Sequence, residues 1–242
     1  MKLKSIALFI FISFIWLNCS ANQLLHEPKS NLSYIVKEAS SPSNLLILIH
    51  GYGSNETDLF SFVNRFPQTT VICVRGPITR SANSYAWYDI AFKPDGNHGR
   101  NLNQALQSET MLLQFIEVMK EKYNTEKTIV GGFSQGAIMS AQIALSHPKA
   151  IDGIICLSGM LLSENTKANE SGAEQYKSIK AFYGHGILDQ VLTIDRGRRC
   201  SATIRKSGIQ LTHKEYPIKH QISGQELKDI ELWYKTNFLA AH

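Results

Sequence analysis

The sequence predicts an α/β fold, with a mostly parallel central sheet and helices on both of its faces. Short apolar runs alternate with longer segments of helical periodicity through most of the chain. Several of the short runs are continuously apolar, as expected of central strands that are buried on both faces. The 242 residues are 43% hydrophobic and 19% charged. This composition is typical of a compact soluble domain, and it excludes disordered, collagen-like and fully membrane-embedded chains.

The predicted strands and helices alternate in the order that this fold requires. Strands are predicted at residues 34–37, 45–49, 71–74, 128–130, 153–157, 181–183 and 211–216. Helices are predicted at residues 55–65, 103–123 and 135–146, in the basic stretch 196–206, and near the end of the chain. Ser223 and Glu226 form a capping box that predicts the start of the last helix. The stretches 76–100 and 160–177 are expected to be irregular loops at the edge of the sheet where ligands bind.

Residues 1–21 are predicted to be an export signal. Lys2 and Lys4 precede an apolar run of twelve residues from 6 to 17, which is too short to cross a bilayer as a helix. Cleavage after Ala21 would release a soluble protein, whereas cleavage before Cys19 would leave a lipid-modified cysteine that attaches the chain to a membrane. Both outcomes remain open.

Residues 22–242 are expected to form one domain. Export predicts a periplasmic, secreted or lipid-anchored protein at the cell envelope. Cys73 and Cys156 lie in apolar runs and are predicted to be buried free thiols. The spacing of the cysteines suggests neither a zinc site nor a disulfide framework, so no metal or cofactor is expected. The oligomeric state is not predicted.

The net charge of +5 falls to +3 without the two lysines of the predicted signal, so a nucleic-acid partner is not implied. The densest basic stretch contains Arg196, Arg198, Arg199, Arg205 and Lys206. A solvated helix face is the simpler interpretation. The alternative is a site for an anionic headgroup or substrate.

The segment TIVGGFSQGAIMSA predicts a nucleophilic serine. A strand leads into Gly132-Phe133-Ser134-Gln135-Gly136, and a helix follows, which is the arrangement of a nucleophile elbow. Such a sharp turn needs glycine two positions on either side of the serine, because a Cβ there would collide with neighbouring backbone. It lifts the Ser134 hydroxyl clear of the sheet, beside the N-terminus of the next helix.

A serine nucleophile needs a base and an orienting acid, which on this type of sheet follow it in the order serine, acid, histidine. Asp189 follows a predicted strand and is the candidate acid, whereas Asp152 precedes its strand and lies at the wrong edge. His220 follows the next predicted strand and is the candidate base. His185 is expected to brace Asp189 from a loop.

The oxyanion formed in acyl transfer needs two N–H donors. The backbone of Gln135, directly after the candidate nucleophile, is the first candidate. The second is the backbone of Tyr52 in the run His50-Gly51-Tyr52-Gly53, which follows an early strand; an ordinary strand-ending turn is the alternative. His50 precedes the nucleophile and is expected to be structural.

Six segments together resemble one enzyme family. They are HGYGSNETDLF from His50, RGP from Arg75, YAWYDI from Tyr85, GFSQGAIMS around Ser134, GHGILD before Asp189 and YPIKHQIS around His220. The chain after the predicted signal is similar to the phospholipase/carboxylesterase family of the α/β-hydrolase fold, which includes acyl-protein thioesterases and bacterial carboxylesterases.

The resemblance implies a Ser134–His220–Asp189 triad, with Tyr52 and Gln135 as oxyanion donors. It also suggests that Trp87 borders the substrate cleft, the alternative being a packed aromatic cluster. Two positions depart from the family pattern: Lys219 replaces a common glycine, and Gln190 replaces a common proline.

The expected function is that of a cofactor-independent serine carboxylesterase that acts on small-molecule or lipid esters through an acyl-enzyme. Lysophospholipase and acyl thioesterase are alternatives with the same mechanism. A non-catalytic binding lipoprotein on a hydrolase scaffold is the alternative from another class.

Overall fold

A computed structural model describes residues 23–39, 44–92, 98–163 and 173–239. Its central sheet has the strand order β1-β2-β4-β3-β9-β10-β11-β12. The strands are β1 (Leu25–Glu27), β2 (Leu32–Lys37), β3 (Asn44–Ile49), β4 (Thr69–Val74), β9 (Lys127–Phe133), β10 (Gly153–Leu157), β11 (Lys180–Gly186) and β12 (Gln210–Tyr216). The pairs β1–β2 and β2–β4 are antiparallel, and all other neighbours are parallel. The predicted α/β class with a mostly parallel sheet is thereby confirmed.

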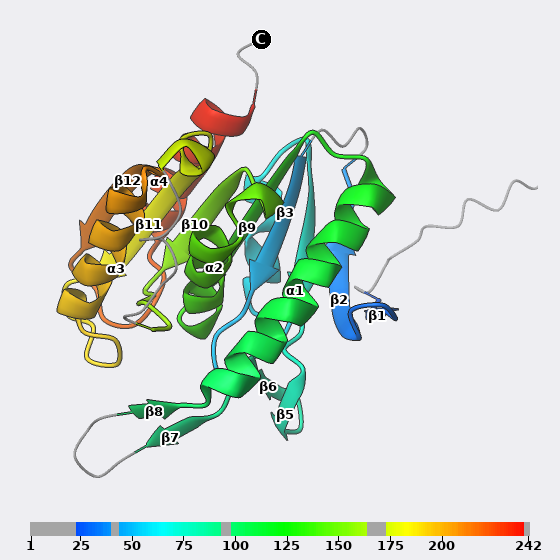
Figure 1. Cartoon of the computed structure of the whole chain (residues 1–242), viewed down its shortest axis with the longest axis horizontal. Helices are drawn as coiled ribbons and strands as arrows, with labels where there is room; N and C mark the ends of the chain where they lie inside the picture. The colour runs from blue at the N-terminus through cyan, green and yellow to red at the C-terminus, as the bar shows by residue number, and fades with distance from the viewer. Residues whose placement is uncertain (1–22, 40–43, 93–97, 164–172, 240–242) are drawn as a thin grey trace, which may run out of the picture.

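Helices cover both faces of the sheet (Figure 1). They are α1 (Leu102–Tyr123), α2 (Gln135–Ser146), α3 (Ile194–Ser207) and α4 (Gly224–Phe238), with short 3₁₀ helices η1 (Leu59–Arg65), η2 (Pro148–Ala150) and η4 (Ala173–Tyr176). The helices α1, α2 and α3 pack on one face, where Phe115, Ile138 and Ile204 join the larger apolar core. On the other face, η1 and α4 contribute Leu59 and Trp233 to a second core. The strands between these layers are apolar on both sides because both of their faces are buried.

Most predicted elements are present; the strand 153–157 and the helix 135–146 have the predicted bounds, and the others are longer by one to four residues, except for the helix 55–65. All seven predicted strands occur, and the capping box of the last helix is formed, because Glu226 N–H donates to Ser223 Oγ at 3.1 Å. The predicted helix 55–65 is wrong in its first half. The Asn55 side chain accepts a hydrogen bond from Thr57 N–H at 2.9 Å, which closes a local turn instead, and a 3₁₀ helix begins only at Leu59.

The stretch 76–100, expected to be irregular, contains two small hairpins. They pair β5 (Ile78–Ser81) with β6 (Ser84–Ala86) and β7 (Ile90–Phe92) with β8 (His98–Arg100). Their strands are three or four residues long, too short for an apolar alternation to be recognised. In Figure 1 they lie beyond the carboxyl end of the sheet, below α1.

The predicted export signal, including Cys19, lies outside the described residues. In the part of the chain that is described, the helices are too short or too polar to span a membrane. Cys73 and Cys156 are buried free thiols, as predicted, and Cys200 in α3 is also buried.

Candidate active site

Ser134 lies at a sharp turn between β9 and α2. Its backbone has φ 55° and ψ −116°, a conformation that residues with a side chain rarely adopt. The Ser134 N–H donates to the carbonyl of Leu157 in the adjacent strand β10 at 2.9 Å, and its own carbonyl accepts from Ile138 N–H at 3.1 Å. These bonds fix the turn from both sides, so the hydroxyl is held above the carboxyl end of the sheet.

The glycines of the motif are required by space. A Cβ on either Gly132 or Gly136 would overlap the carbonyl oxygen of Ile49 in β3. That atom belongs to the backbone of a central strand and cannot move aside. The glycine pattern therefore follows from how closely β9 and α2 approach β3.

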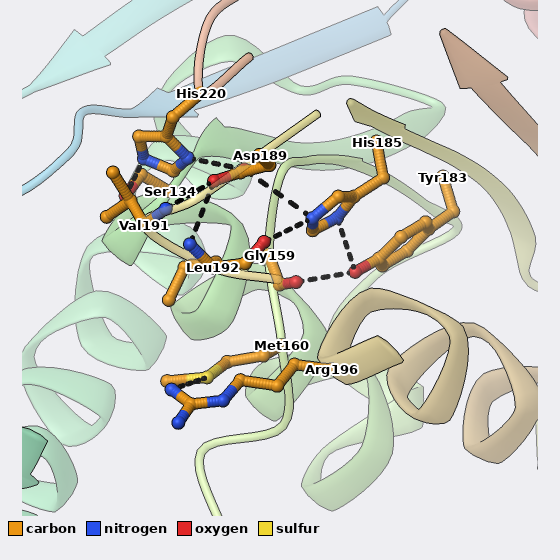
Figure 2. A network of polar contacts seen from close by, with 10 residues as sticks. All are labelled: Ser134, Gly159, Met160, Tyr183, His185, Asp189, Val191, Leu192, Arg196 and His220. Carbon is orange, nitrogen blue, oxygen red and sulfur yellow. Dashed lines mark hydrogen bonds and ion pairs between the residues drawn. The ribbon is translucent and has the colours of Figure 1, made fainter. Parts of the chain in front are cut away.

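Three side chains from separate loops meet at this turn (Figure 2). His220 Nε2 lies 2.9 Å from Ser134 Oγ, and His220 Nδ1 lies 2.7 Å from Asp189 Oδ2. Because a carboxylate only accepts hydrogen bonds, Nδ1 carries the proton and Nε2 is left as the acceptor for the serine hydroxyl. The three residues that the sequence singled out thus form one continuous hydrogen-bonded chain.

The Asp189 carboxylate is buried and its other oxygen is also bonded. Oδ1 accepts from the N–H groups of Val191 and Leu192 at 2.8 and 2.9 Å. Burial raises the pKa of Asp189, but the bonds from His220 and from the two backbone groups outweigh it, so the pKa lies below its ordinary value. The carboxylate is therefore ionised at neutral pH and can hold the imidazole in one tautomer.

His185 braces this loop, although it belongs to β11 rather than to a loop. Its Nε2 donates to the carbonyl of Leu192 at 2.7 Å and lies 3.5 Å from Asp189 Oδ2. Burial lowers the pKa of His185, so the ring is neutral. Gly186, the last residue of β11, lies close to the segment that leads to His220. A Cβ on Gly186 would overlap the carbonyl of Ile218, two residues before His220.

The two candidate oxyanion donors lie beside the serine in the chain or in space. Gln135 follows Ser134 as the first residue of α2. Gly51 approaches the serine so closely that a Cβ on it would be 3.4 Å from Ser134 Cβ, and Tyr52 is the next residue. The backbone around Tyr52 is fixed by Gly53 N–H, which donates to Tyr85 O at 2.8 Å.

A buried network of polar groups holds this loop against α2. His50 Nδ1 donates to Gly51 O at 2.7 Å, and its Nε2 accepts from Gly76 N–H at 2.9 Å, which requires a neutral ring. Burial lowers the pKa of His50 accordingly. The Gln135 side chain accepts from Trp87 N–H and donates to Tyr88 O, both at 2.8 Å. No local sequence pattern pointed to these supporting contacts.

Trp87 does not border an open cleft. Its side chain is fully buried, and its indole N–H donates to the carbonyl of His50 at 3.0 Å. The suggested cleft position is therefore corrected to the packed alternative. The backbone of Trp87 is also held by helix α1, where Ser108 Oγ donates to the Trp87 carbonyl at 2.5 Å.

Comparison with known proteins identifies the family of the chain. The family model described as phospholipase/carboxylesterase matches residues 30–238. The chain is 25% identical over 174 residues to carboxylesterase SOBER1 of Arabidopsis thaliana, covering 70% of this chain and 73% of the relative. It is 32% identical over 153 residues to acyl-protein thioesterase 1 of Candida albicans, covering 60% and 65%. Across four such relatives, the matched region spans between 43% and 73% of the relative's length.

Solved structures show the same fold. A carboxylesterase from Mesorhizobium loti superposes with a TM-score of 0.76 at 19% identity, over 88% of this chain and 98% of that one. Esterase PE8 superposes with a TM-score of 0.74 at 23% identity, over 86% and 99%. The central sheet and its helices are thus those of an α/β-hydrolase. The family match covers most of the chain, and the chain therefore belongs to the phospholipase/carboxylesterase family.

Proposed function

We propose that this protein is a serine hydrolase that cleaves carboxylic esters through an acyl-enzyme. The observation that carries the proposal is the continuous chain of hydrogen bonds from Ser134 through His220 to Asp189. An imidazole whose Nδ1 faces a carboxylate and whose Nε2 lies 2.9 Å from a serine hydroxyl is in the position of a general base.

In the proposed first step, Ser134 Oγ attacks the ester carbonyl carbon while His220 Nε2 takes the hydroxyl proton. Asp189, held ionised by its neighbours, stabilises the imidazolium that forms. The carbonyl oxygen becomes an oxyanion, which the N–H groups of Tyr52 and Gln135 are proposed to bind. When the tetrahedral intermediate collapses, the imidazolium gives its proton to the departing alcohol and the acyl group stays on Ser134.

Water then attacks the acyl-enzyme by the same route. His220 takes a proton from the water, the carboxylic acid leaves, and Ser134 recovers its proton. The N-terminus of α2 adds positive potential where the oxyanion forms in both steps.

A thioester would react by the same sequence of proton transfers, since only the leaving atom differs. The named relatives include both carboxylesterases and acyl-protein thioesterases, so thioester cleavage is the second candidate function. Lysophospholipids are a further class of substrate for the same triad. Export, if residues 1–21 direct it, favours small esters or lipids at the cell envelope over palmitoylated cytosolic proteins.

The test is Ser134→Ala, assayed with phenyl butyrate and its sulfur analogue S-phenyl thiobutyrate. Turnover of both should fall on the order of 10⁴-fold or more, because the nucleophile is lost while folding is preserved. Ser201→Ala, in α3, is the matched control, because its hydroxyl only donates to Arg198 O within the helix.

A fluorophosphonate probe gives a second readout. It should label the wild type and the Ser201→Ala variant at Ser134 and leave the Ser134→Ala variant unlabelled. Undiminished turnover in Ser134→Ala would remove the proposed nucleophile. A folded wild type that neither reacts with the probe nor hydrolyses either substrate would favour the binding-protein alternative.

A further inference from the structure

Three arginines surround a cavity at the carboxyl end of the sheet. The cavity has a volume of about 160 Å³ and is lined by Arg100, Met160, Leu161, Arg196 and Arg199. Arg100 ends β8, Met160 and Leu161 follow β10, and the other two arginines lie in the first two turns of α3. The cavity thus lies where three separate segments converge, and its wall is strongly basic.

Among the described residues, no acid pairs with the three arginines of this cavity. Arg196 and Arg199 are three residues apart on α3, close enough for their like charges to repel. Their neighbour Arg198 differs, because its guanidinium forms two 2.8 Å bonds to Glu215 in β12. Within the described residues, no carboxylate is within ion-pair distance of Arg100, Arg196 or Arg199.

Two of the guanidinium groups are held on the cavity wall by weak or neutral partners. Arg100 Nη1 donates to Leu161 O at 2.8 Å, and Arg196 Nη1 lies 4.0 Å from Met160 Sδ. A guanidinium carries five N–H donors, so each of these contacts uses only one of them. The one acid in the first turn of α3, Asp195, lies 3.8 Å from Arg198 instead.

The cavity is connected to the triad through two short segments. Leu157 O accepts the Ser134 N–H, and three residues later the chain reaches Met160. On the other side, the loop that carries Asp189 reaches Leu192, two residues before α3 begins at Ile194. Figure 2 shows Leu192 between the triad and the pair formed by Met160 and Arg196.

We infer that this arginine cavity binds an anionic group, a carboxylate or a phosphate, that the ester substrate itself carries. The inference rests on the proposed function, because it assigns the anion and the scissile carbonyl to one molecule at one edge of the sheet. Guanidinium groups match both anions through paired N–H donors, and bound anion would relieve the repulsion among three convergent positive charges. Arg198, Arg205 and Lys206 are exposed, as the solvated helix face expected from the sequence requires, and Arg199 is exposed as well as lining the cavity.

The test compares pairs of substrates that differ only in charge. Mono-p-nitrophenyl esters of succinic, adipic, suberic and sebacic acids are each assayed against the neutral p-nitrophenyl ester of the same chain length. At the length that spans from Ser134 to the cavity, kcat/KM should be about tenfold higher for the charged ester, the size of one charge-assisted hydrogen bond at a part-exposed site. This preference should shrink as NaCl is added.

Variants then assign the preference to the cavity. The double variant Arg196→Gln with Arg199→Gln should lose most of the preference for the charged ester, whereas Arg198→Gln, on the same helix, should keep it. Persistence of the preference in the double variant would overturn the inference. If the double variant does not fold, the wild-type rates alone still test the inference. Equal wild-type rates for the charged and the neutral ester at every chain length would overturn it.

Inorganic phosphate separates a substrate-borne anion from a free one. Phosphate should compete with the charged esters more strongly than with their neutral partners. Inhibition by phosphate without any preference for charged esters would mean that the cavity holds a free anion, which also overturns the inference. Turnover of neither ester would instead remove the proposed function and, with it, this inference.

Discussion

Replacing Asp189 with asparagine tests the tautomer that the site geometry assigns to His220. The asparagine carbonyl can keep the bonds from Val191 and Leu192 N–H, which Oδ1 now accepts at 2.8 and 2.9 Å. Its NH₂ group then faces His220 Nδ1 in place of Oδ2, at a distance of 2.7 Å. Two donors cannot bond to each other, so the imidazole proton must move to Nε2, where it blocks proton transfer from Ser134.

The expected loss follows from this change of tautomer. A triad held in the wrong tautomer loses about 10⁴ in kcat, which corresponds to roughly 5 kcal/mol of activation free energy at about 1.36 kcal/mol per tenfold change. Initial rates with p-nitrophenyl butyrate measure the loss. The melting temperature should change little, because both backbone N–H groups keep an acceptor.

The matched control is Asp152→Asn. Asp152 also accepts a backbone bond, from Thr128 N–H at 2.9 Å, and pairs with Lys127, but it precedes β10 at the opposite end of the sheet. This variant should retain nearly full activity. A kcat for Asp189→Asn within tenfold of the wild type would refute the tautomer argument, as would an equal loss in both variants.

Two further predictions concern the stability of the scaffold. Glu226 is almost fully buried, and burial raises its pKa from 4.5 to about 7. Between these two pH values the folded state holds a proton that the unfolded state has lost. The unfolding free energy should therefore fall by about 3 kcal/mol as the pH rises through this range. Urea titrations of Glu226→Gln should lack that fall, and parallel pH curves for both proteins would contradict the assignment. Gly136→Ala should cost about 3 kcal/mol or prevent folding, because its Cβ would overlap Ile49 O. Gly224→Ala, with open space around it, should leave the unfolding free energy nearly unchanged, and equal destabilisation of the two variants would show that close packing is not the reason for Gly136.

The meeting of the three proposed triad residues could be predicted because each is marked by its place relative to a strand. Ser134 lies in a motif whose glycines report the close approach to β3, and Asp189 and His220 follow β11 and β12. These signals lie within a few residues of each position, or depend only on the order of strands and helices along the chain. The continuous apolar runs of the buried strands are equally local, which is why the sheet could be predicted nearly strand by strand.

The contacts that support the loop from His50 to Gly53 could not be predicted in this way. His50 bonds to Gly76, and Trp87 bonds back to His50, over 26 and 37 residues of chain. The hydrophobic periodicity of the sequence does not indicate such contacts, because they depend on how two loops fold over one strand end. The wrong helix at 55–65 has a different reason. Asn55 is a typical helix-capping residue, but its side chain accepts from Thr57 N–H and closes a local turn, and Glu56 pairs with Arg75 at 2.5 Å outside the segment.

The sheet fixes the proposed nucleophile more firmly than the proposed base. Ser134 follows β9, which is paired on both sides by β3 and β10, and its unusual backbone conformation persists because those neighbours leave no alternative. His220 follows β12, which pairs only with β11 and is the edge strand of the described sheet. Edge strands open at lower free energy than central ones. Substitutions that loosen the pairing of β12 should therefore displace the base and reduce turnover before they lower global stability, whereas substitutions in β3 or β10 should lower both together.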